Sequence, residues 1–199
     1  MKILSINVAA VGDLFPGTSG NAHQVKTGIH KRSVTGTVAV RRLGLNGDEQ
    51  ADLSVHGGLD KAVYAYPVEH YDFWREQCAA NLKCAPAEVD LAPGTMGENL
   101  TLEGIVETDV WIGDRLHIGD TVLQVTEPRH PCFKFNAKMR FAHASKRMIQ
   151  SGFSGFYLRV VQTGMLRAGD QITLVPGPRE VALNWLNERR RKGRQEDLF

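Results

Sequence analysis

Short segments with the composition of β-strands dominate this chain and limit the folds that it can adopt. Each is rich in β-branched or aromatic residues and is bounded by Gly, Asp or Pro, which favour turns. These segments span residues 2–8, 36–42, 62–67, 98–102, 115–125, 156–161 and 171–175. Because so many short strands would leave unpaired edges in an open sheet, we predict a mainly β fold built on a closed or nearly closed β-barrel.

Three other segments have helical patterns, and we expect them to lie at the periphery of the barrel. Residues 67–82 place their apolar side chains on one helical face and begin with a proline suited to a first turn. Residues 137–150 are weakly helical, and residues 179–192 predict a terminal helix. A Pro-Gly-Pro sequence precedes this last helix. We therefore expect one domain over residues 1–176 and a short helical tail over 177–199.

Composition argues against several classes of protein. The net charge of +2 gives no field that would attract nucleic acid, and the basic ERRRKGR run fits a solvated helix end. No run of about eighteen apolar residues is present to span a membrane. The opening MKILSINVAAVGD alternates like a strand and lacks a secretory cleavage site. The three cysteines have no CxxC spacing and fit a reducing cytoplasm better than a disulfide framework. From these observations together, we expect a cytoplasmic protein that binds neither membranes nor nucleic acid.

Cys132 lies in an unusual local sequence, EPRHPCFKFNAK. Its neighbours are basic residues and a histidine: Arg129, His130, Lys134 and Lys138. Nearby cations favour the thiolate, the form of cysteine that attacks electrophiles and binds soft metals. Cys132 is therefore a candidate nucleophile, with His130 or His56 as its base, or a candidate metal ligand. A buried cysteine with a purely structural role is the alternative.

The sequence VHGGLDKAVYAY, at 55–66, is a second candidate site. Its adjacent Gly57 and Gly58 allow the backbone to approach a ligand closely, and with Lys61 the loop can hold a phosphate. The motif lacks the Lys-Ser/Thr ending of a P-loop, so a tight turn that enters a strand is the alternative. Asn99 belongs to a residue type that is depleted in strands. It fits either a buried hydrogen-bonding role or the edge of a turn.

Motifs for other cofactors are absent from the sequence. It contains no Gly-rich dinucleotide fingerprint and no cysteine set for an iron–sulfur cluster. A zinc site made from His56, His130, Cys132 or His143 would lack the paired-ligand spacing of known zinc sites. Residues alone therefore indicate a β-rich domain with basic loops and one activated cysteine, and they name no reaction.

Six sequence blocks, taken together, resemble MOSC domains, the module shared with the C-terminal part of molybdenum cofactor sulfurases. The blocks are TGIHKRSV, GDEQADLSVHGGLDKAVYAY followed by EHYDFW, MGENLT, VWIGDRLHIGD, LQVTEPRHPCFK and GFYLRVVQTGMLRAGD. They occur in order, with similar spacing, from the first strand to about residue 176. The chain looks most like the stand-alone bacterial members of YiiM type.

This resemblance implies a barrel-like fold that holds a pyranopterin molybdenum cofactor (Mo-molybdopterin). Cys132 matches the family's cysteine, which is thought to bind molybdenum through its thiolate, and would be the catalytic residue. The resemblance assigns the following residues of the matching blocks to cofactor binding: Lys31, His56, Gly57, Gly58, Lys61, Asn99 and Arg129. The cations among them would contact the phosphate of the cofactor.

Proteins similar to this one are linked to the reduction of N-hydroxylated bases, such as 6-hydroxylaminopurine, to the amine. The resemblance thus implies an oxidoreductase with a small N-hydroxylated substrate and a separate electron-donor protein. A cofactor carrier without turnover and a sulfur-transfer or thiol protein are the alternatives. YiiM-type relatives usually continue into a three-helix segment, whereas only about twenty residues follow Pro178 here. The resemblance allows a homodimer, and the shorter tail would remove any dimer contact that the three-helix segment provides in those relatives.

Overall fold

The computed structural model describes residues 1–16, 25–52 and 57–196. At its centre lies an eight-stranded sheet with the order β13-β9-β10-β11-β7-β8-β1-β4. All neighbours in this sheet are antiparallel except β7 and β8, which are parallel. The strands are β1 (Lys2–Val8), β4 (Arg32–Val34), β7 (Val63–Pro67), β8 (Leu100–Glu103), β9 (Arg115–Ile118), β10 (Thr121–Pro128), β11 (Phe156–Gln162) and β13 (Thr173–Val175).

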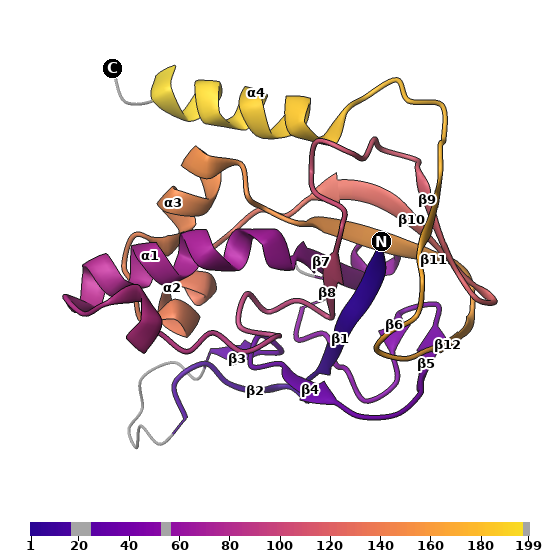
Figure 1. Cartoon of the computed structure of the whole chain (residues 1–199), viewed down its shortest axis with the longest axis horizontal. Helices are drawn as coiled ribbons and strands as arrows, with labels where there is room; N and C mark the ends of the chain where they lie inside the picture. Colours follow the sequence, from indigo (N-terminus) through magenta and orange to yellow (C-terminus); the bar gives the residue numbers. More distant parts are fainter. Residues whose placement is uncertain (17–24, 53–56, 197–199) are drawn as a thin grey trace.

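The sheet curls like a half-barrel, and the start of β1 links it to the segment before β13. The amide of Ile3 donates to the carbonyl of Asp170 at 3.0 Å, and the amide of Gly169 donates to the carbonyl of Ile3 at 2.8 Å. Lys2 and Gln171 form an isolated antiparallel bridge. Because β13 is the opposite end of the strand order, these bonds bring the sheet close to closure. The prediction of a mainly β, barrel-like fold is confirmed (Figure 1).

Smaller strands and the helices surround this sheet. A three-stranded sheet has the order β12-β5-β6 and a two-stranded sheet joins β2 to β3. Their strands are β2 (Gly12–Asp13), β3 (Lys26–Thr27), β5 (Val38–Arg41), β6 (Gly44–Leu45) and β12 (Gly164–Leu166). The helices are α1 (Tyr71–Leu82), α2 (Phe133–Met139), α3 (Ala144–Ser151) and α4 (Leu183–Glu196), with short 3-10 turns η1 (Leu59–Lys61), η2 (Val68–His70) and η3 (Pro86–Glu88). Among the helices described, none has the length and apolar character needed to cross a bilayer.

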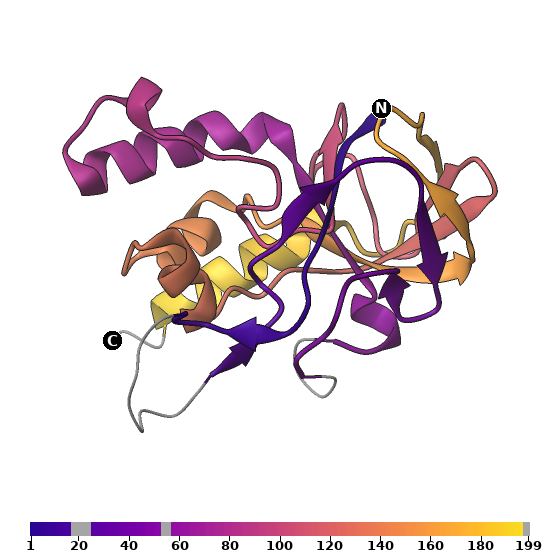
Figure 2. The ribbon, with the colours of Figure 1, turned by 90° about the horizontal axis from the view of Figure 1, so that it is seen from below.

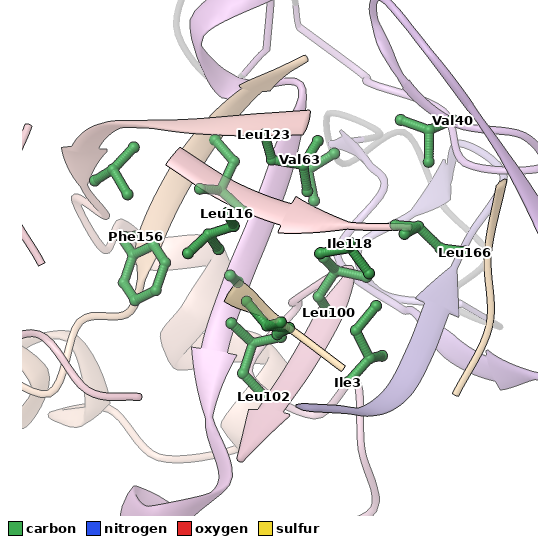
Figure 3. Close-up of a cluster of buried hydrophobic side chains, with 14 of the residues drawn as sticks. Ile3, Val40, Val63, Leu100, Leu102, Leu116, Ile118, Leu123, Phe156 and Leu166 are labelled. Atoms are coloured by element: carbon green, nitrogen blue, oxygen red, sulfur yellow. The ribbon is translucent and has the colours of Figure 1, made fainter. Parts of the chain in front are cut away.

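Strand β7 is buried on both faces and separates two apolar clusters. Val63 and Ala65 point to one side, into a core of aliphatic side chains from the curled sheet (Figure 3). Tyr64 and Tyr66 alternate with them and point to the other side, into an aromatic cluster that includes Trp74 of α1. Side chains alternate across a strand, so the sequence VYAY supplies a small aliphatic face and a large aromatic face from one segment.

The aromatic cluster fills the space between the sheet and α1, α2 and α3. These helices gather on one side of the sheet, and α4 runs above them in Figure 1; Figure 2 shows the same helical side from below. Trp74 is fully buried, packs edge-on against Phe135 of α2 at a centroid distance of 5.3 Å, and donates its indole N–H to the hydroxyl of Tyr66 at 2.6 Å. This layer fixes α2, and with it the segment that carries Cys132, against β7.

The helix predicted over residues 137–150 is two helices. Arg140 ends α2 in the left-handed conformation with φ of 49°, and α3 starts afresh at Ala144. The helix predicted over 67–82 is confirmed in its α1 part, with η2 as its first turn. The terminal helix begins at Leu183, four residues later than predicted, because Ala182 bridges to Trp111 in extended conformation.

Candidate functional site

Cys132 lies between the end of β10 and the first turn of α2, with its side chain partly buried and its thiol free. The Cys132 carbonyl accepts hydrogen bonds from the amide of Phe135 and from the hydroxyl of Ser145, both at 2.9 Å. These bonds tie the segment to α2 and α3. Pro131, which precedes the cysteine, further restricts the backbone. The sulfur is therefore presented from a fixed loop.

A cavity that encloses about 100 Å³ brings Cys132 together with most of the residues predicted for the site. We call it the Cys132 cavity. The predicted residues on its wall are Lys31, Lys61, Asn99, Arg129, His130 and Cys132. Lys134, from the same basic sequence as Cys132, also lines it and donates from its ammonium to the Lys26 carbonyl at 2.9 Å. Segments far apart in the sequence thus meet at one hollow on the helical side of the sheet.

Arg129 is buried, and its guanidinium is held between two rings. It lies 4.8 Å from the ring centroids of both Tyr64 and Phe135. One terminal nitrogen, Nη1, donates to the Met96 carbonyl and, at 3.3 Å, to the Tyr64 hydroxyl. Arg129 also interacts electrostatically with Cys132. A guanidinium held by rings and carbonyl acceptors is a permanent positive charge, so the cavity keeps one beside the sulfur.

Lys31 is paired with Asp48, a residue that the sequence did not single out. The ammonium donates to Asp48 Oδ1, and the two side chains are only 9% and 5% exposed. Burial lowers the pKa of Lys31, and the Asp48 carboxylate counteracts this effect. Because Asp48 already balances its charge, Lys31 adds less positive potential to the cavity than the sequence suggested.

Asn99 connects this ion pair to the sheet. Its Nδ2 donates to Asp48 Oδ2 at 2.8 Å and to the Asn7 carbonyl at 3.3 Å, while its Oδ1 accepts from the Tyr64 amide at 3.0 Å. The side chain is buried just before β8. Of the two alternatives, the buried hydrogen-bonding role is the one observed. Asn99 also borders the cavity, but its amide hydrogens are already used by the protein.

Lys61 lies in η1 with its side chain partly exposed. Its ammonium is 3.6 Å from a carboxylate oxygen of Glu127 and 5.9 Å from the ring centroid of Tyr157. Tyr157 itself lines the cavity and interacts electrostatically with Cys132. Lys61, in η1, and Cys132, in the loop before α2, thus line the same cavity as Tyr157.

The paired glycines pack against Gln50 rather than lining the cavity themselves. The Gly58 amide donates to Gln50 Oε1 at 2.8 Å, and a Cβ on Gly57 would come within 2.4 Å of the same oxygen. Gln50 does line the cavity. The close backbone approach predicted for these glycines is therefore made to a protein side chain. His56 falls outside the described residues.

Glu98 is a second residue that the sequence analysis missed. It is fully buried, and its Oε1 accepts from the Tyr71 hydroxyl, from the Gly94 amide at 2.7 Å and from the Thr101 hydroxyl at 2.9 Å. Its Oε2 has no hydrogen-bond partner among the residues that the structure describes. Burial raises the pKa of this carboxyl group. The strand-like MGENLT block carries no pattern that distinguishes a buried acid from a turn residue, so sequence alone gave no signal.

A family model for the MOSC domain matches residues 52–173. The chain belongs to the MOSC domain family. It is 38% identical over 187 residues to the "Uncharacterized protein YflK" of Bacillus subtilis, covering 94% of this chain and 79% of that one. It is 37% identical to the "Protein YiiM" of Escherichia coli, covering 74% of this chain and 63% of that one. A fungal protein named "Reductase", from Gibberella moniliformis, is 40% identical over 78% of this chain, which spans only 27% of that protein.

Solved structures agree with this assignment. The crystal structure of YiiM from Geobacillus stearothermophilus superposes with a TM-score of 0.75 at 31% identity and covers 97% of this chain and 85% of that one. MOSC domains are associated with binding of the molybdenum cofactor. The family prediction made from the six sequence blocks is therefore confirmed.

The side chains that line the Cys132 cavity are of the types that a molybdenum cofactor needs, a thiol for the metal and cations for a phosphate. One thiol can supply a single soft ligand to a metal that carries its other ligands with it. In the described part of the chain, no three His, Cys, Asp or Glu side chains gather to hold a metal by themselves. Arg129, Lys61 and Lys134 border the same cavity as cations suited to a phosphate group.

Proposed function

We propose that this MOSC protein binds a pyranopterin molybdenum cofactor in the Cys132 cavity and reduces N-hydroxylated bases, such as 6-hydroxylaminopurine, to the amine. The observation that carries the proposal is the shared wall of Cys132, Arg129 and Lys61 around one hollow. Membership of the MOSC family and the similarity to a protein named as a reductase support it.

Cys132 would bind the metal through its thiolate, held by the loop that α2 and α3 fix in place. Arg129 would act as a permanent charge for the phosphate and for the thiolate, since both rings that hold it are themselves packed in the aromatic cluster. Lys61 and Lys134 would add further charge at the wall of the cavity. Lys31 and Asn99 would shape this wall through Asp48 rather than by binding the phosphate.

The reaction consumes two electrons and two protons and releases water, so that R–NHOH becomes R–NH₂. When bound, the cofactor would supply the two-electron redox chemistry. The protein must supply protons at the cavity, where His130 and Lys31 are among the wall residues able to carry them. The electrons would come from a separate donor protein, because the sequence carries no second redox-cofactor motif.

A turnover assay with chemically reduced viologen as electron donor tests this function. The holoprotein, produced in a molybdate-replete host, should convert 6-hydroxylaminopurine to adenine, and Cys132→Ala should lose this activity. Cys84→Ala, which alters a free cysteine in the loop after α1, is the matched control and should keep it. Protein that retains the cofactor but shows no turnover would instead indicate a cofactor carrier.

A further inference from the structure

Tyr157, on β11, is a further residue of the Cys132 cavity wall. It pairs with Tyr64 in the register of β11 and β7, and its half-buried ring packs against the Tyr64 ring at a centroid distance of 5.2 Å. The ammonium of Lys61 lies 5.9 Å from the centroid of the Tyr157 ring. Neighbours on the sheet and in η1 therefore hold this phenol in the wall that also carries Cys132.

The hydroxyl of Tyr157 differs from those of the other three tyrosines of the chain. Each of those donates to a protein oxygen: Tyr64 to the Ser154 carbonyl at 2.7 Å, Tyr66 to the Phe153 carbonyl at 3.0 Å, and Tyr71 to the Glu98 carboxylate. Within residues 1–16, 25–52 and 57–196, no group accepts a hydrogen bond from the Tyr157 hydroxyl. The buried side-chain polar atoms without a partner in the described chain are Glu98 Oε2 and Thr121 Oγ1, so the Tyr157 hydroxyl is not buried. Its proton is left for a ligand in the cavity.

The charges around Tyr157 suit a group that gives up a proton and takes it back. Burial raises the pKa of Tyr157, so the phenol carries its proton at neutral pH, and the nearby charge of Arg129 counteracts this rise. Arg129 and Lys61 would thus stabilise the phenolate that forms when the proton leaves. Lys31, another wall residue that can carry a proton, is already bonded to Asp48.

We propose that the Tyr157 hydroxyl donates a proton to the oxygen that leaves the substrate in the Cys132 cavity. When R–NHOH is reduced, the N–O bond breaks, and the departing hydroxyl joins the proton of Tyr157 to leave as water. The two electrons, supplied by the reduced molybdenum cofactor, stay on the nitrogen, which takes a second proton from solvent to give R–NH₂. Water then returns a proton to the phenolate. This inference rests on the proposed function and adds the proton donor to it.

Tyr157→Phe removes only the hydroxyl and keeps the ring that packs against Tyr64. Because no protein hydrogen bond is lost, we expect the melting temperature and the molybdenum content per chain to match the wild type. Turnover of 6-hydroxylaminopurine should fall about 100-fold or more, the usual effect of losing a positioned proton donor. Tyr66→Phe is the matched control, since its hydroxyl donates to a carbonyl outside the cavity wall. It should lower the melting temperature and keep turnover.

A change of leaving group separates a proton donor from a residue that only supports the fold. The O-acetyl derivative of 6-hydroxylaminopurine releases acetate, a weak base that departs without being protonated. Tyr157→Phe should therefore reduce this derivative at about the rate of the wild type. A merely structural role would slow the reduction of both compounds equally.

Calorimetric titration of the oxidised holoprotein, with no electron donor present, tests the same contact without turnover. Tyr157→Phe should bind 6-hydroxylaminopurine about three- to tenfold more weakly than the wild type does, because one hydrogen bond to the hydroxyl oxygen is lost. Adenine lacks this oxygen, so both proteins should bind it equally.

The outcomes distinguish this inference from the proposed function. Turnover by Tyr157→Phe at the wild-type rate, or equal slowing with both leaving groups, would overturn the proton donor and leave the reductase function standing. Loss of molybdenum from Tyr157→Phe would assign the hydroxyl to cofactor binding and would also overturn it. A wild type without turnover would contradict the proposed function itself, and the proton donor with it.

Discussion

Lys31 and Asp48 form a buried ion pair at the wall of the Cys132 cavity, and Asp48 is also the acceptor for two other groups. Besides the ammonium, its carboxylate accepts from the Ala9 amide at 2.9 Å and from the Asn99 side chain at 2.8 Å. A buried charge whose partner is removed loses most of its compensation. Asp48 therefore holds Lys31, Ala9 and Asn99 together at the cavity wall, and loss of either charge of the pair should lower the free energy of unfolding.

Replacing one partner of this pair should be costly. We expect Asp48→Asn to lower the free energy of unfolding by about 3–5 kcal/mol, because the ammonium of Lys31 stays buried without a counter-charge. Urea denaturation measures the effect. The double variant Lys31→Met, Asp48→Asn removes both charges and should recover much of the loss. A single variant as stable as the wild type would show that the pair is not buried as described.

Removal of the Asn99 side chain should also destabilise the fold. Asn99→Ala deletes three hydrogen bonds and leaves the amide of Tyr64 without its acceptor. We expect a loss of about 2–4 kcal/mol in unfolding free energy. Asn81→Ala is the control, since Asn81 is exposed on α1 and makes one long contact of 3.5 Å. Similar losses in both variants would argue against a special role for Asn99.

Glu98 should make stability depend on pH. Burial raises the pKa of its carboxyl group in the folded protein above the unfolded value. The neutral acid is favoured by folding, so this contribution is complete below the unfolded pKa and is lost as the pH rises through the folded pKa. Glu98→Gln mimics the neutral form and should therefore gain stability relative to the wild type as pH increases. Denaturation of both proteins across a pH series measures this difference.

The control for this experiment is Glu76→Gln, because Glu76 is an exposed residue of α1. Its stability relative to the wild type should not change with pH in the same window. If Glu98→Gln behaves like Glu76→Gln, the carboxyl group of Glu98 is ionised at no cost, and its surroundings must be more polar than the structure indicates.

Replacing Arg129 with lysine should destabilise the fold, although the positive charge is kept. The guanidinium contacts two rings at once and donates to the Met96 carbonyl, whereas an ammonium is a compact charge that cannot make all of these contacts. We expect Arg129→Lys to lower the free energy of unfolding by about 1–3 kcal/mol. Arg75→Lys, on the exposed side of α1, should cost little. Thermal melting of the two variants compares them directly.

Sequence patterns predicted the parts of this fold that have a clear period. β1, β7 and β11 alternate and were recognisable as strands, while α1 shows a helical stripe. Two-residue strands such as β2 and β6 are too short to carry a period. The break at Arg140 was missed because a left-handed cap formed by a residue other than Gly has no strong sequence signal.

The candidate site was predicted less completely than the fold. Cys132 and Arg129 stood out because both lie in one basic sequence. The pairing of Lys31 with Asp48 could not be recognised in the sequence, since the two residues are 17 positions apart. Asp48 also follows a glycine, which is typical of a turn residue. Contacts of this kind depend on how β1, β8 and the intervening loops pack together, and local composition does not record that arrangement.

Metal analysis of the purified protein tests the central claim most directly. Wild type, Cys132→Ala and the control Cys84→Ala should be expressed side by side in a molybdate-replete host, and molybdenum should be quantified per chain by mass spectrometry. We expect wild type and Cys84→Ala to contain molybdenum and Cys132→Ala to contain far less. Equal molybdenum in Cys132→Ala and the wild type, or none in any of the three proteins, would contradict the proposal that this sulfur holds the metal.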